Sequence, residues 1–84
     1  KMDKYIERLL KIEQRIYKRG IEIQNQYGFK IPDYVLYEIV KSEKDKNNIR
    51  NIIQLINLAM INKRILLKDA RILTKDIRSR KIYE

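Results

Sequence analysis

The sequence predicts an all-α protein, a compact bundle of about four helices. Apolar residues recur at steps of three and four along most of the 84 residues, which is the spacing of one helix face. Two Gly and one Pro supply few turns, which favours long helices over many short strands. A chain of this length has room for one hydrophobic core. We therefore expect residues 1–84 to form a single small helical domain.

The central helix is predicted over residues 45–61. After Arg50 this segment carries no charge until Lys63, and its polar residues Arg50, Asn51, Gln54 and Asn57 form one narrow stripe. A helix that is apolar around most of its circumference must be covered on more than one side. Ser42 with Asp45 three residues later resembles a capping arrangement, and it predicts the helix start at about residue 43–45.

The first helix is predicted over residues 3–27, because one apolar stripe spans this range: Met2, Tyr5, Leu9, Ile12, Ile16, Gly20, Ile23 and Tyr27. Gly20 lies in phase with the stripe and would let a crossing helix approach closely; a break at Gly20 is the alternative. Gly28 is predicted to end the helix in the left-handed conformation. The stripe also fits a coiled-coil seam with a second copy, but its breadth favours packing onto its own domain.

Two shorter helices complete the predicted bundle. Pro32 and Asp33 suit the start of a helix over 32–41. A tight turn at residues 62–64 precedes the last helix, predicted over 66–80 with its core stripe at Leu66, Ala70, Leu73 and Ile77. A single helix over 45–80 is the alternative. The two C-terminal helices and their turn could form a helix-turn-helix-like pair.

The composition restricts the chemistry. There is no Cys and no His, which argues against the usual zinc sites, thiol nucleophiles, disulfides and imidazole catalysis. No Gly-rich phosphate loop occurs, and the paired carboxylates have basic neighbours, so we expect neither an enzyme nor a cofactor or metal site. No apolar run reaches the ~20 residues of a membrane span. We expect a cytoplasmic protein without a membrane partner.

The basic residues are unevenly distributed. The formal net charge is +9, and the surplus lies at the two ends of the chain, while residues 31–62 are neutral. In the last helix the cations Lys68, Arg71, Lys75 and Arg78 recur at steps of three, four and three, about 150° around the helix from the core stripe. Arg64 and Lys81 lie near the two ends of this row. A row roughly 15 Å long matches the reach needed to follow a phosphate backbone.

These observations predict a small basic protein that binds nucleic acid, most favourably duplex DNA, in an accessory or regulatory role. The candidate nucleic-acid-binding residues are Arg64, Lys68, Arg71, Lys75, Arg78 and Lys81. The alternative is a helical protein-interaction or dimerisation module whose basic faces are only solvated surface. Its partner would be a second copy of the chain, or an acidic or apolar-grooved protein.

Overall fold

The computed structural model describes residues 3–84 and confirms an all-α fold with four α-helices in the described chain. Helix α1 covers Lys4–Gln24, α2 covers Asp33–Ser42, α3 covers Ile49–Ile61 and α4 covers Leu67–Arg78. Two short 3₁₀ turns, η1 at Lys46–Asn48 and η2 at Lys81–Tyr83, precede α3 and follow α4. The alternative of a single helix over 45–80 is excluded, because residues 62–66 separate α3 from α4.

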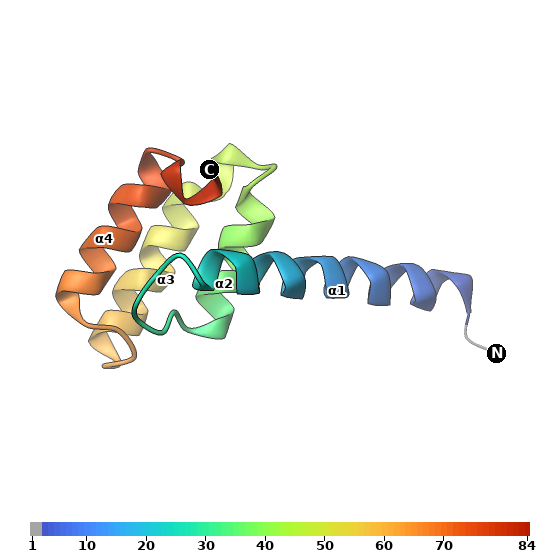
Figure 1. The fold of residues 1–84 in the computed structure, drawn as a ribbon, viewed down its shortest axis with the longest axis horizontal. Coiled ribbons are helices and arrows are strands. Elements are labelled where there is room, and N and C mark those ends of the chain that lie inside the picture. Colours follow the sequence, from blue (N-terminus) through green and yellow to red (C-terminus); the bar gives the residue numbers. More distant parts are fainter. Residues whose placement is uncertain (1–2) are drawn as a thin grey trace.

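Helices α2, α3 and α4 lie side by side and enclose the core together with the end of α1 (Figure 1). The core consists of aliphatic side chains contributed by every α-helix and by the chain end: Ile23, Ile31, Val35, Ile39, Ile52, Ile56, Ala59, Ile65, Ala70, Leu73, Ile77 and Ile82. Ala70, Leu73 and Ile77 follow the predicted stripe of the last helix. Leu66 does not: it precedes α4 in an extended conformation and is exposed, and Ile65 takes its place in the core.

Helix α1 runs through Gly20 without a break, as predicted. Gly20 is buried, and a Cβ atom there would lie 3.9 Å from Cγ2 of Val40 on α2, an ordinary contact distance. The helix is shorter than the predicted 3–27, because the side chain of Gln24 binds the following loop. Its amide nitrogen donates to the carbonyl oxygen of Phe29 (2.7 Å), and its oxygen accepts from the backbone N–H of Ile31 (2.8 Å). The predicted left-handed Gly28 is wrong, since neither glycine has a positive φ.

The expected packing of α1 along its own domain is also wrong for its first half. Figure 1 shows this half projecting from the bundle as an arm, so the molecule measures 48 × 24 × 22 Å. Tyr5, Leu9 and Ile12 of the predicted stripe are exposed, and so are Ile6 and Leu10 beside it, whereas Gly20 and Ile23 are buried. Helix α2 has only ten residues and crosses the second half of α1, which leaves the first half uncovered. Met2 lies outside the described residues.

The start of the central helix differs from the prediction. Ser42 is the buried last residue of α2, and its hydroxyl donates to the carbonyl oxygen of Ile39 (2.7 Å). Asp45 caps η1, where its carboxylate accepts from the N–H of Asn47 (3.0 Å), so α3 itself begins at Ile49. The helix is covered less completely than expected, because its apolar Ile61 is 70 % exposed.

The chain end is held against α1 and α2 by a polar network. Arg19 on α1 donates two hydrogen bonds to the Glu43 carboxylate (3.1 and 3.0 Å) and one to the carbonyl oxygen of Tyr83 (3.2 Å). Arg80 donates to the carbonyl oxygen of Glu43 (2.8 Å), and its guanidinium lies 4.6 Å from the centre of the Tyr83 ring. The Tyr83 hydroxyl bonds to Ser42 and to the carbonyl oxygen of Ile39. This network explains why Ile82 is fully buried.

Replacing Ile82 tests the contribution of the chain end. We expect Ile82→Ala to lower the free energy of unfolding by about 2–5 kcal/mol, because it leaves a cavity in the core. Urea unfolding followed by circular dichroism measures the change. The matched control is Ile61→Ala, whose side chain is 70 % exposed and for which we expect a change within about 0.5 kcal/mol. Equal effects of the two substitutions would contradict the described packing.

Two half-buried tyrosines, Tyr27 and Tyr83, make the free energy of unfolding depend on pH in the alkaline range. The pKa of Tyr27 is raised by burial and by its hydrogen bond to Asp76 (2.7 Å), and burial raises the pKa of Tyr83. A raised pKa in the folded state stabilises the fold fully below the unfolded pKa of about 10, and this contribution is lost as pH rises through the folded pKa. We expect the free energy of unfolding, measured in urea, to fall above about pH 10.

Tyr27→Phe should make this alkaline loss less steep, because it removes a hydroxyl whose pKa is raised in the folded state. The control is Tyr5→Phe at an exposed position, which should leave the steepness unchanged. A wild-type stability that stays constant between about pH 9 and pH 11.5 would contradict the assigned shifts.

Candidate nucleic-acid interface

The connection between α3 and α4 sets the position of the basic helix. Lys63 has a φ of 60°, its N–H donates to the carbonyl oxygen of Met60 (3.0 Å), and the N–H of Arg64 donates to that of Ala59 (2.8 Å). This pair of bonds is a Schellman motif, which ends a helix with a left-handed residue. It confirms the predicted tight turn at 62–64, although no Gly is present to favour it.

Helices α3 and α4 then run side by side in opposite directions (Figure 1). This course is that of an αα-hairpin, two antiparallel helices joined by a short loop. Helix α4 lies along the bundle (Figure 1). The surface it offers is its long side.

Helix α4 has two opposed faces. Ala70, Leu73 and Ile77 are buried in the core, while the four cations of the predicted row are exposed. Asp76 lies on neither face: it is half-buried and accepts the hydrogen bond from Tyr27, which fixes α4 against the loop between α1 and α2. The two faces are opposed because the spacing of these residues along the helix places the apolar residues and the cations nearly half a turn apart.

A surface groove separates α3 from the basic side of α4. It is lined by Ile53, Asn57 and Met60 from α3, and by Leu67, Ala70, Arg71, Thr74, Lys75, Arg78 and Ser79 from α4 and its end. We call this the α3–α4 groove. Its lining contains three cations, three neutral polar residues that can form hydrogen bonds, four apolar residues and no carboxylate. The α4 side is thus suited to an elongated anionic ligand.

The six predicted site residues do not form one cluster. Arg71, Lys75 and Arg78 lie together along the α3–α4 groove, and Lys68 is exposed on the same helix. Lys81 is exposed in η2, beyond the end of α4.

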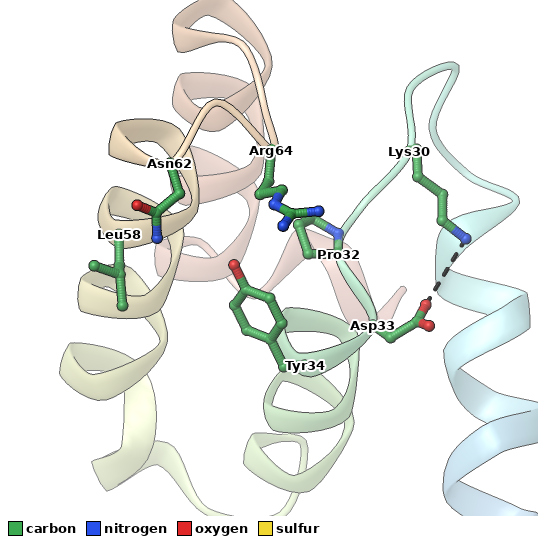
Figure 2. A pocket seen from close by; sticks show the side chains of 7 residues that line it. All are labelled: Lys30, Pro32, Asp33, Tyr34, Leu58, Asn62 and Arg64. Carbon is green, nitrogen blue, oxygen red and sulfur yellow. Dashed lines mark ion pairs between the residues drawn. The ribbon is translucent and has the colours of Figure 1, made fainter.

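Arg64 lies in a separate hollow between the start of α2 and the end of α3. Figure 2 shows this hollow, which is lined by Lys30, Pro32, Asp33, Tyr34, Leu58, Asn62 and Arg64. Lys30 forms an ion pair with Asp33 there (3.8 Å), so this second hollow carries an acidic group. That carboxylate makes it less suited to phosphate than the α3–α4 groove.

The predicted cations are free of carboxylate partners within residues 3–84. The ion pairs in this part of the chain use Arg19, Lys30 and Lys41 as their basic members. An ion pair would have to be broken, or shared, before such a cation could bind a phosphate. The positive charge on α4 is therefore available to a ligand without that cost.

The α3 wall of the groove was not predicted from the sequence. Asn57 was assigned only to a polar stripe on the central helix, and Ile53 and Met60 to its apolar remainder. The stripe was nevertheless a signal, because a polar residue in a nearly uncharged helix marks the side that is not covered by the core. The stripe alone did not show that α4 would lie beside it, because this depends on the direction of the turn between α3 and α4.

Within residues 3–84 no group of three or more acidic side chains lies close enough together to hold a metal ion. None of the helices in the same range is long and apolar enough to cross a bilayer. Comparison of the sequence with protein-family models and curated proteins, and of the fold with solved structures, found no match.

Proposed function

We propose that the protein binds nucleic acid, with duplex DNA as the favoured ligand, through the basic side of α4. The observation that carries the proposal is the groove beside α4, where Arg71, Lys75 and Arg78 line one wall and no carboxylate is present. Lys68 extends this row toward the start of the helix, and Lys81 continues it beyond the end. Phosphate binding by such a row gains free energy mainly from the release of condensed counterions.

The proposed contact is along the backbone of the duplex. Helix α4 lies flat against α3, so its side chains can follow successive phosphates without entering the major groove. Phosphate contacts fix position and orientation but do not read sequence. We therefore propose an accessory or regulatory role with weak sequence preference. Arg64 lies in the separate hollow and has the least support among the six predicted residues.

A protein-interaction module remains the second candidate function. The specific observation in its favour is the first half of α1, whose apolar side chains are exposed and are not covered by any other segment of residues 3–84. This surface lies on the arm, whereas the basic groove lies between α3 and α4. The two functions therefore use different surfaces and can be tested separately.

Fluorescence anisotropy of a labelled duplex of about 20 base pairs, titrated at several salt concentrations, tests the nucleic-acid proposal. If about five phosphates are neutralised, log K should fall with log salt at a slope near −4.5. Arg71→Gln with Lys75→Gln should weaken binding at every salt concentration and bring the slope to about −2.7, because two phosphate contacts are lost.

The control for this variant is Lys44→Gln with Lys46→Gln, which removes the same charge from an exposed loop outside the groove. It should leave the slope near that of the wild type. Equal weakening by the two double variants would assign the binding to net charge alone, and absence of binding at low salt would refute the proposal.

A further inference from the structure

The arm formed by the first half of α1 presents an unpaired apolar surface, which we call the arm face. It consists of Tyr5, Ile6, Leu9, Leu10 and Ile12, whose side chains are 44–68 % exposed. An isolated helix in water gains no packing energy from such residues, and most helical stability in proteins comes from packing of an apolar face. Within residues 3–84, the arm face is therefore an apolar helix surface without the packing that usually stabilises such a face.

The arm face continues the surface that α2 covers. At 100° per residue, the apolar residues of the first and second halves of α1 lie on the same side of the helix. On the second half, Gly20 is buried against Val40 of α2, and Glu13 accepts a hydrogen bond from the Tyr37 hydroxyl of α2 (3.1 Å). The apolar side of α1 thus lies against α2 from about residue 13 onward. Between residues 4 and 12, no other segment of the described chain covers this side.

We propose that the arm face binds the arm face of a second copy of this chain, with the two α1 helices antiparallel. The direction follows from α2. In a parallel pair both α2 helices would occupy the space between the two α1 helices at the same level. In an antiparallel pair, the arm of the second copy lies along the first half of α1 and α2 lies along the second half. Each α2 is then beyond the tip of the other copy's arm, and the two do not overlap. The symmetry axis then passes near residues 8 and 9.

Charge supports the same register. Glu13 is the acidic residue on the apolar side of α1, and its Oε1 binds Tyr37 while its second oxygen has no hydrogen-bond partner in the described chain. With the axis between residues 8 and 9, Tyr5 lies at the level of Ile12 of the second copy, and Glu13 lies at the level of the first turn of the second copy's α1. The second copy's helix N-terminus, with its partial positive charge, comes to the same place.

The size of the surface indicates a reversible dimer. Five large side chains, each about half exposed, would remove on the order of 1,000 Å² from water over both copies, which is the lower end of specific interfaces. Each chain carries a net charge of +9, and Arg8 lies at the edge of the arm face near the axis. Salt screens this repulsion. Dimerisation should therefore strengthen as salt rises, while binding to nucleic acid weakens.

Disulfide trapping tests the geometry, because the chain has no native Cys. A mixture of Tyr5→Cys and Ile12→Cys proteins should form the mixed disulfide under mild oxidation. Tyr5→Cys alone should not form a disulfide-linked dimer, since in the antiparallel pair the two positions are about 10 Å apart along the helix axis. A dimer of Tyr5→Cys with itself, in place of the mixed one, would indicate a parallel pair and overturn the proposal.

Sedimentation velocity at micromolar concentrations tests whether the dimer exists. The wild-type protein should show concentration-dependent dimer formation that increases with salt, and Leu9→Gln with Leu10→Gln should be monomeric. The matched control is Ile72→Gln on α4, a similarly exposed apolar residue outside the arm (47 %), which should dimerise like the wild type. A monomeric wild type at high salt, or equal effects of the two variants, would overturn the proposal.

Discussion

The bidentate pair between Arg19 and Glu43 joins three parts of the chain that are distant in sequence. Arg19 belongs to α1, Glu43 follows α2, and the same guanidinium binds the carbonyl oxygen of Tyr83 at the chain end. Glu43 raises the pKa of the Arg19 guanidinium through these hydrogen bonds. Both side chains are about one third exposed or less, so water competes only partly with the pair. A charge-assisted bidentate contact fixes orientation as well as distance, and here it fixes how α1 crosses α2.

This crossing determines which surfaces of the protein remain free. Because α1 is attached to α2 by its second half, the first half extends beyond the bundle and keeps its apolar side exposed. At the other end, the hydrogen bond from Tyr27 to Asp76 occupies the acidic side of α4 and turns the cations toward α3 and solvent. The proposed nucleic-acid surface and the proposed dimer surface therefore lie on different helices, and occupation of one leaves the other accessible.

The helices were predictable from local patterns, because periodicity, Pro32 and the polar segment before residue 49 each act within a few residues. The opposed core and basic sides of α4 followed from the same repeat. What could not be predicted depends on contacts outside the helical repeats, some of them local and some between distant segments. Gln24 ends α1 by binding the next loop, and Lys63 adopts the left-handed conformation that was expected of Gly28. The groove beside α4 depends on the direction that the chain takes in the turn between α3 and α4. The arm is uncovered because α2 is short.

Amide chemical-shift mapping would locate the surface that contacts nucleic acid, which we propose to be the basic side of α4. The ¹⁵N-labelled protein would be titrated with an unlabelled duplex at low salt, and shifts would be compared along the chain. We expect the largest changes at Arg71, Lys75, Arg78 and Asn57, with small changes at Lys44 and Lys46. Large changes confined to the arm of α1, or the absence of change throughout α4, would contradict binding along α4.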